Sequence, residues 1–307
     1  MRSNSQKTST YRGRFAPSPT GPLHLGSLLA AVGSYLQAKR QHGLWLLRME
    51  DIDPPREIAG AADDILRTLE AYGLYWDESV LYQSTRSDAY EQVLQQLKQD
   101  ELLYACECSR KQISQIAQRG VNGYIYPGTC RHKIISPNHH AWRLIVENKT
   151  VKFNDAMAGL IHHKLTDESG DVVLKRADGL YAYQLAVVVD DIFQNISEVV
   201  RGNDLLMQTP VQLQLMYYLN ASPPNYVHLP IIVNTLGQKL SKQTGALALP
   251  SKNLNHVLWS ILKLLGQAIP QELKQENLST IWSWAIEHWS IKKLEPQIKI
   301  PHDLNFH

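Results

Sequence analysis

Two short segments of this 307-residue chain have the residue types and spacing to bind a polyphosphate. The first runs from Arg14 to Ser27 and reads RFAPSPTGPLHLGS: a strand-like start, a turn rich in proline and glycine, and an apolar pattern with helical spacing from Leu25. The amino end of a helix presents unpaired N–H groups and a positive dipole end, which suit a phosphate. His24 could add a donor, and Gly26 would let a flat adenine ring approach the backbone. Taken alone, an ordinary strand-to-helix turn explains this segment equally well.

The second segment is Lys239-Leu240-Ser241-Lys242, in a glycine-flanked loop after the apolar run from Val227 to Val233. Two lysines three residues apart in such a loop can neutralise the charge that develops on a triphosphate as pyrophosphate leaves. A solvated surface turn is the alternative for this segment alone. The two segments occur in this order about two hundred residues apart, which favours a shared nucleotide site.

Together the two segments resemble the ATP motifs of class I aminoacyl-tRNA synthetases, in the form used by glutamyl-tRNA synthetases. Further matches are RMEDID at 48–53, YQLAVVVDD at 183–191 and VRGND at 200–204, and the resemblance runs from about Tyr11 to about Leu249. It implies an α/β fold with a Rossmann-like parallel sheet, L-glutamate as the amino acid, and ATP with magnesium as cosubstrate.

The resemblance also assigns roles at matching positions. Glutamate has two carboxylates and one ammonium, so its pocket needs two cations and an anion, and arginine grips carboxylates with two parallel hydrogen bonds. The implied glutamate site consists of Arg14, Phe15, Ala16, Pro17, Ser18, Glu50 for the ammonium, Tyr183 and Arg201. The implied ATP site consists of His24, Gly26, Lys239, Ser241 and Lys242, with His24 and Lys242 stabilising charge during catalysis. A surface Arg–Glu ion pair and a core tyrosine are the structural alternatives. Asp190 and Asp191 could hold a cation, cap a helix or orient the pocket.

All three cysteines lie in one short segment, at Cys106, Cys108 and Cys130, which favours a structural zinc site over unrelated thiols. Tetrahedral zinc needs a fourth ligand. General chemistry favours His132. The resemblance implies another choice, because short members of the glutamyl-tRNA synthetase family use a tyrosine four residues before the last cysteine, which here is Tyr126. We expect Tyr126, with His132 as the alternative.

Composition places the chain among ordinary globular proteins, with 44% hydrophobic and 20% charged residues and a net charge of +2. Any RNA contact must therefore come from local basic patches. The polar first ten residues do not read as a signal peptide, and no apolar run is long enough to span a membrane. We expect a cytoplasmic monomer without a membrane partner.

The pattern of elements predicts four parts. Residues 11–103 form the first half of the nucleotide-binding fold, with a strand at 45–49 and helices at 57–72 and 88–99. Residues 104–178 form an inserted acceptor-like α+β subdomain with the zinc site and short strands at 142–146 and 159–165. Residues 179–250 form the second half with the KLSK loop, and residues 251–307 a helical C-terminal region whose tryptophans, Trp282, Trp284 and Trp289, favour a core stripe over base stacking.

After Lys242 the sequence has 65 residues (307 − 242), too few for the large anticodon-binding region of glutamyl-tRNA synthetases. The chain therefore resembles their truncated paralogues, which activate glutamate without tRNA and place it on the cyclopentenediol of queuosine in the anticodon loop of tRNA(Asp). The partners expected are L-glutamate, ATP and queuosine-containing tRNA(Asp). The alternatives are a minimal enzyme that charges a tRNA 3′ end, and a non-catalytic RNA-binding relic of a synthetase.

Overall fold

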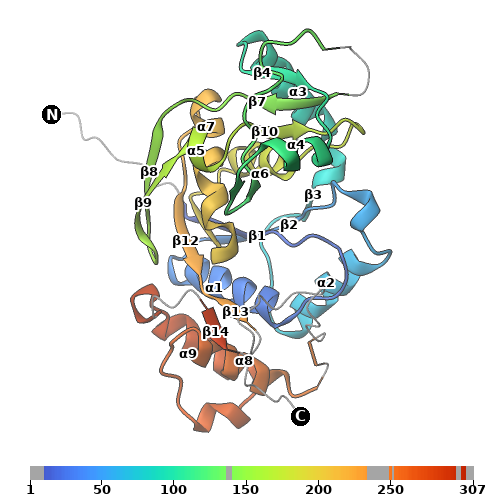
Figure 1. The fold of residues 1–307 in the computed structure, drawn as a ribbon. Coiled ribbons are helices and arrows are strands. Elements are labelled where there is room, and N and C mark those ends of the chain that lie inside the picture. The colour runs from blue at the N-terminus through green and yellow to red at the C-terminus, as the bar shows by residue number, and fades with distance from the viewer. Residues whose placement is uncertain (1–9, 136–139, 234–248, 251, 295–298, 302–307) are drawn as a thin grey trace, which may run out of the picture.

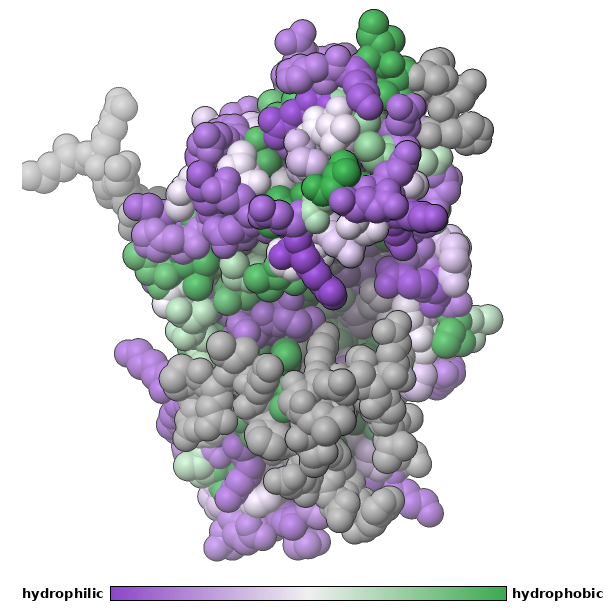
Figure 2. Space-filling view, viewed as in Figure 1, coloured by the Kyte–Doolittle hydropathy of each residue, from purple (hydrophilic) through white to green (hydrophobic). Residues whose placement is uncertain are grey.

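The computed structural model describes residues 10–135, 140–233, 249–250, 252–294 and 299–301. Parallel strands occupy the middle of the molecule, a smaller mixed layer lies at one end, and C-terminal helices lie at the other (Figure 1). On the face seen in Figure 2, the end that holds the mixed layer is mostly hydrophilic, with scattered apolar residues. None of the helices in these described ranges is long and apolar enough to cross a membrane.

The first motif begins in a three-stranded parallel sheet of order β1-β2-β3. Its strands are β1 (Arg12–Phe15), β2 (Leu44–Met49) and β3 (Leu81–Tyr82), and the connecting helices are α1 (Leu25–Arg40) and α2 (Ala61–Ala71). Every residue of β2 after Leu44 is buried, as expected of a parallel strand covered on both faces. The predicted strand at 45–49 and the helix from Leu25 are thus confirmed.

A second group of strands continues this sheet sideways. The amide of Ser197, just before β11, donates to the carbonyl of Arg12 in β1 over 2.9 Å, so β11 lies beside β1. The order here is β11-β12-β8-β9, with β11 and β12 parallel. The elements are β8 (Thr150–Asp155), β9 (Gly159–Lys164), α6 (Tyr183–Phe193), β11 (Glu198–Gly202), α7 (Thr209–Tyr218), β12 (Asn225–Leu229) and β13 (Ile231–Val233).

The hairpin of β8 and β9 joins this central sheet, because Asp155 pairs with Tyr226 of β12 in parallel. The sequence assigns this hairpin to the inserted segment, but its pairing places it next to the nucleotide fold. Of the other strands around that segment, β10, β7 and β4 form an antiparallel sheet in this order, and β5 and β6 pair with each other. The elements of this part and its neighbours are α3 (Ser87–Gln99), β4 (Leu103–Cys106), α4 (Arg110–Ile116), β5 (Arg119–Gly120), β6 (Gly123–Tyr124), β7 (Ala141–Leu144), α5 (Leu165–Glu168) and β10 (Val172–Lys175).

The helix predicted at 57–72 starts later than expected, at Ala61. Two prolines begin a short 3₁₀ turn, η1 (Pro54–Arg56), and Gly60 then adopts φ +78°, a left-handed conformation that interrupts a right-handed helix. Elsewhere in the described ranges, 3₁₀ turns occur at η2 (Gln83–Arg86), η3 (Asn203–Gln208), η5 (Glu272–Gln275) and η6 (Ile291–Lys293). The helix predicted at 88–99 is confirmed as α3.

The C-terminal region is helical, as predicted, and packs against α1. Its helices are α8 (Leu254–Leu264) and α9 (Leu278–His288), and it also contributes β14 (Lys299–Pro301), which pairs in parallel with β13. The ring centroids of Trp282 and Tyr35 lie 4.9 Å apart in an edge-to-face arrangement, and Nε1 of Trp282 donates to the Tyr72 carbonyl over 2.8 Å. Trp289 Nε1 donates to Gln37 over 2.9 Å. Trp282 and Trp289 are both buried, which confirms the prediction that they belong to the core. Trp284 is half-buried and stacks on His288.

We expect Trp282→Ala to lower the free energy of unfolding by about 3–5 kcal/mol, because it leaves a cavity in the core shared by α1 and α9 and an unpaired carbonyl at Tyr72. Urea unfolding followed by circular dichroism measures the loss. Trp284→Ala is the matched control and should cost clearly less, since Trp284 packs only at the margin of this core. Equal losses in the two variants would contradict this account of the interface.

Candidate active site

A cavity of about 660 Å³ lies at the carboxyl ends of β1, β2 and β11. In parallel α/β sheets this edge is where ligands bind, because loops from several strands converge there. The walls come from the loop between β1 and α1, from Glu50 after β2, and from residues 200–205. Every residue predicted to bind glutamate lines this cavity: Arg14, Phe15, Ala16, Pro17, Ser18, Glu50, Tyr183 and Arg201.

The amino end of α1 faces the same cavity through His24, Gly26 and Ser27. His24 caps the helix, since its Nδ1 accepts from the Ser27 amide over 3.2 Å. A Cβ atom on Gly26 would lie 3.2 Å from the His24 ring, closer than side chains normally approach. Glycine at this position therefore also leaves room for the capping imidazole. The predicted ATP residues Lys239, Ser241 and Lys242 lie outside the described residues.

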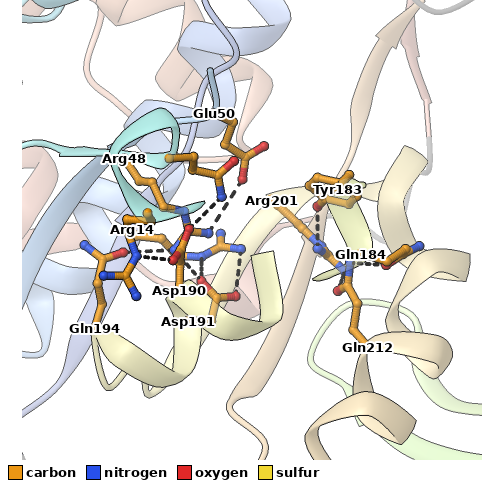
Figure 3. Close-up of polar contacts among 12 residues, drawn as sticks. Arg14, Arg48, Glu50, Tyr183, Gln184, Asp190, Asp191, Gln194, Arg201 and Gln212 are labelled. Atoms are coloured by element: carbon orange, nitrogen blue, oxygen red, sulfur yellow. Dashed lines mark hydrogen bonds and ion pairs between the residues drawn. The ribbon is translucent and has the colours of Figure 1, made fainter. Parts of the chain in front are cut away.

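A buried ion cluster forms one side of the cavity (Figure 3). Asp191 accepts two hydrogen bonds from Arg14, at 3.1 and 3.3 Å, and its Oδ1 lies 2.8 Å from Nη1 of Arg48. Arg48 also donates to Gln194 over 2.9 Å and lies 3.6 Å from Glu50. Burial alone would raise the pKa of Asp191, but the charges of Arg14 and Arg48 outweigh it and lower that pKa. Asp191 thus stays ionised and orients the pocket, one of the three roles left open for it above.

Glu50 has the opposite balance. Its burial raises its pKa more than the neighbouring arginines lower it, and Arg48 is the nearest of these. A ligand ammonium placed beside Glu50 would stabilise the ionised carboxylate and bring that pKa back down. The side of the cavity at Glu50 is therefore suited to a cationic group.

Arg201 lies on the other side of the cavity and is held by neutral partners (Figure 3). It donates to the Tyr183 hydroxyl over 3.1 Å, to Thr209 over 2.8 Å, to Gln212 over 2.9 Å and to Nε2 of His228 over 3.0 Å. Because none of these side chains carries a compensating charge, Arg201 keeps its attraction for an anionic ligand. The Tyr183 hydroxyl accepts from Arg201, so its own proton can be donated to that ligand.

The contact with Arg201 fixes the protonation of His228. Arginine only donates, so Nε2 of His228 must accept, and its Nδ1–H then donates to Asp155 over 2.7 Å. Burial lowers the pKa of His228, the nearby Arg201 and Arg14 lower it further, and Asp155 only partly opposes them. A neutral imidazole therefore sits between a buried carboxylate and a buried guanidinium.

The sequence did not reveal the residues that support the two arginines. Arg201 is supported by Thr209, Gln212 and His228, and His228 in turn by Asp155. On the side of Arg14, Arg48 contacts Asp191 and donates to Gln194. One signal was available for Asp191. It follows Tyr183 by eight residues in the same helix, so the two side chains point about 80° apart and can border neighbouring parts of one pocket. His228 and Asp155 carry no comparable signal, because they meet only through the pairing of β12 with β8.

A second candidate site lies in the inserted segment, where the sulfur atoms of Cys106, Cys108 and Cys130 are within 4.8 Å of one another. The hydroxyl of Tyr126 is 3.3 Å from the sulfurs of both Cys106 and Cys108. His132 is exposed. Bonds of 2.3 Å to a tetrahedral zinc ion would place sulfurs about 3.8 Å apart, so this donor set can hold a metal of that kind.

Residues 10–258 match the family model described as tRNA synthetases class I (E and Q), catalytic domain. Two curated relatives are both named Glutamyl-Q tRNA(Asp) synthetase. The one from Dechloromonas aromatica is 52% identical over 94% of this chain and 97% of its own length. The one from Serratia proteamaculans is 47% identical over 96% of this chain and 95% of its own length.

Solved structures with the same fold are longer. A glutamate tRNA ligase from Elizabethkingia meningosepticum, in complex with its amino acid, superposes with a TM-score of 0.75 at 22% identity. The match covers 94% of this chain and 66% of that one. A glutamate-tRNA synthetase from Elizabethkingia anophelis gives a TM-score of 0.76, also at 22% identity, over 96% of this chain and 68% of that one. This likeness supports the class I α/β fold with a parallel sheet.

The state of His228 predicts how stability depends on pH. Its folded pKa is lowered, so the unfolded chain binds a proton first as pH falls below about 6.5, and the folded state loses stability from there down to the folded pKa. We expect wild type to lose up to about 1.4 kcal/mol per pH unit more than His228→Gln in this range. Urea unfolding at a series of pH values measures the difference.

His132→Gln is the control for this experiment, because His132 is exposed and its replacement should leave the wild-type pH dependence intact. Parallel curves for wild type and His228→Gln would mean that His228 is not buried in its neutral form.

Proposed function

Because this chain belongs to the catalytic-domain family of class I tRNA synthetases (E and Q), we propose that it activates L-glutamate with ATP and transfers it to a modified tRNA. The acceptor is the cyclopentenediol of queuosine in the anticodon loop of tRNA(Asp). The observation that carries this assignment is 52% identity, over nearly the full length of both chains, to a protein named for that reaction. We also propose that the enzyme works in the cytoplasm, where its tRNA acceptor is found, and that it works as a monomer.

Glutamate fits the charges that line the cavity. Arg201 and Arg14 face its carboxylates, and Arg201 contributes the larger attraction because Asp191 already neutralises Arg14. Tyr183 donates its hydroxyl proton to the carboxylate beside Arg201, and Glu50 receives the ammonium. Ser18 and the segment Phe15-Ala16-Pro17 close the cavity around the carbon chain.

ATP occupies the end of the cavity at α1. The helix amino end and His24 meet its phosphates, and Gly26 admits the adenine. Lys239, Ser241 and Lys242 complete this site in our proposal, and magnesium, when bound, would neutralise part of the phosphate charge. The α-carboxylate of glutamate attacks the α-phosphate, and pyrophosphate leaves. No covalent enzyme nucleophile is needed, so the protein acts by positioning and by electrostatic stabilisation.

In the second step a hydroxyl of the acceptor attacks the activated carbonyl and AMP leaves. The four-part division at 11–103, 104–178, 179–250 and 251–307 assigns activation to the nucleotide fold and support of the acceptor to the inserted segment. The hairpin of β8 and β9 is the part of that segment that pairs with the central sheet.

We further propose that Cys106, Cys108, Cys130 and Tyr126 hold a structural zinc ion. The sulfurs already converge, and the Tyr126 hydroxyl lies 3.3 Å from two of them, whereas His132 is exposed. When bound, the metal would tie β4 to the segment around Cys130, and all four positions would be filled by protein atoms, as in structural sites.

Replacement of single ligands tests the metal site. Cys108→Ser and Tyr126→Phe should each weaken zinc binding by more than about tenfold, the loss that even outer-sphere changes cause. His132→Ala should retain the metal. Zinc content of the purified proteins, measured after dialysis against a weak chelator, gives the result. Loss of zinc in His132→Ala together with retention of zinc in Tyr126→Phe would show that His132, and not Tyr126, is the fourth ligand.

The function itself is tested with labelled glutamate. Purified tRNA(Asp) with queuosine should accept the label, tRNA(Asp) without queuosine should not, and periodate treatment of the queuosine-containing tRNA beforehand should abolish acceptance, because periodate cleaves the vicinal diol. Arg201→Lys should reduce acceptance strongly, since lysine cannot reproduce the several fixed donors of Arg201. Label on the 3′ end of tRNA(Glu) would instead make this a minimal charging enzyme.

A further inference from the structure

A smaller cavity of about 200 Å³ opens from the main one. The two share walls at Ser18, Thr20, Glu50, Arg56 and Tyr183. His24 and Gly26 line only the main cavity, so the second one adjoins the glutamate end and lies away from the ATP end. The residues that line only the second cavity include Asp53, Glu57, Gln83 and Arg176.

Two side chains that line this second cavity each have an acceptor atom without a hydrogen-bond partner among the described residues. These atoms are Oε1 of Gln83 and Oε1 of Glu57, and both are shielded from solvent. A buried acceptor with no donor costs about 1–3 kcal/mol, and such atoms in native proteins call for an explanation. Two of them on side chains that line one small cavity indicate a ligand that brings donors.

The direction of the Gln83 amide is fixed by its surroundings. Gln83 is fully buried, and its Nε2 donates to Asp190 over 2.8 Å. A carboxylate cannot donate, so the amide nitrogen must face Asp190 and the amide oxygen must face elsewhere. Asp190 is itself held by Arg86 at 2.6 Å and by the Tyr90 hydroxyl at 2.7 Å. Gln83, which lines the cavity, is therefore held in one orientation that leaves its amide oxygen without a partner among the described residues.

Carboxylates and guanidinium groups both line the cavity. Glu57 lies among carboxylates: burial raises its pKa, and Asp51 and Asp53 raise it further, so a cationic donor would be favoured there. Arg56 and Arg176 both pair with Asp53, and both side chains are at least one third exposed. Exposed guanidinium groups suit a phosphate backbone, whereas the carboxylate of Glu57 suits hydroxyl or ammonium donors.

We propose that the second cavity is the acceptor subsite, in which Glu57 and Gln83 receive the donors of the acceptor nucleoside: its vicinal hydroxyls and the amine that carries them. This inference rests on the proposed function, because it places the acceptor of that reaction. The subsite holds the diol next to Glu50 and Tyr183, where the activated glutamate lies. Glu57 and Gln83 act as binding and positioning residues, and glutamate activation does not involve them.

The test compares the two half-reactions in Glu57→Gln, which keeps the shape of the side chain and removes its charge. ATP–pyrophosphate exchange with glutamate should stay at the wild-type level, while the KM for queuosine-containing tRNA(Asp) rises about 10- to 100-fold. Inhibition of the transfer by queuosine-free tRNA(Asp) should keep its wild-type inhibition constant, because that tRNA lacks the donors. Glu70→Gln, an exposed glutamate on α2, is the matched control and should change none of these values.

A second variant tests the volume of the cavity. Ile52 lines it, and Ile52→Phe should narrow it and raise the same KM, again with normal exchange. An unchanged KM in both variants would overturn the proposal, and so would a parallel loss of exchange or an equal weakening by queuosine-free tRNA. Failure of the proposed function is distinguishable, because wild type would then not transfer glutamate to queuosine-containing tRNA(Asp) at all.

Discussion

The carboxylate of Asp191, buried between Arg14 and Arg48, is the interaction on which the rest of the site depends (Figure 3). Two guanidinium groups cannot be buried side by side without an anion, since an uncompensated buried charge costs several kcal/mol. Asp191 supplies that anion from α6, whereas the two arginines come from β1 and β2. The contacts of Asp191 with these two arginines therefore fix α6, β1 and β2 relative to one another before any ligand binds. A pocket that is preorganised in this way spends little binding free energy on ordering its own side chains.

The two arginines that face the cavity are thereby made unequal. Arg14 shares its charge with Asp191 over a bidentate contact, while the direct partners of Arg201 are neutral. The carboxylate of Asp155 lies behind Arg201, and the neutral imidazole of His228 separates the two. Burial lowers the pKa of His228 and keeps its imidazole neutral, so His228 does not form an ion pair with Asp155. The cavity therefore attracts anions mainly at Arg201 and holds its shape mainly at Arg14.

The sequence was sufficient for the parts of this site that are local. The turn after β1, the capped start of α1 and the positions of Glu50, Tyr183 and Arg201 each follow from a short motif. It was insufficient where a contact joins distant segments: Asp191 and Arg14 are 177 positions apart, and His228 and Asp155 are 73 apart. Spacing also could not choose between Tyr126 and His132, which lie on either side of Cys130. Their difference in exposure arises from the fold of the inserted segment, and the choice of Tyr126 remains a proposal.

Helix α6 links the two cavities through neighbouring residues with separate tasks. Successive helical residues point about 100° apart, so Asp190 and Asp191 address different surroundings. Asp191 orients Arg14 and Arg48 for the main cavity, and Asp190 orients Gln83 in the second. Tyr183, at the amino end of the same helix, lines both cavities. Each carboxylate has its own set of hydrogen-bond donors, so the hydrogen bonds behind the wall of the second cavity are separate from those of the ion cluster. A scaffold of this kind would let the acceptor specificity diverge while the chemistry of glutamate activation stays the same.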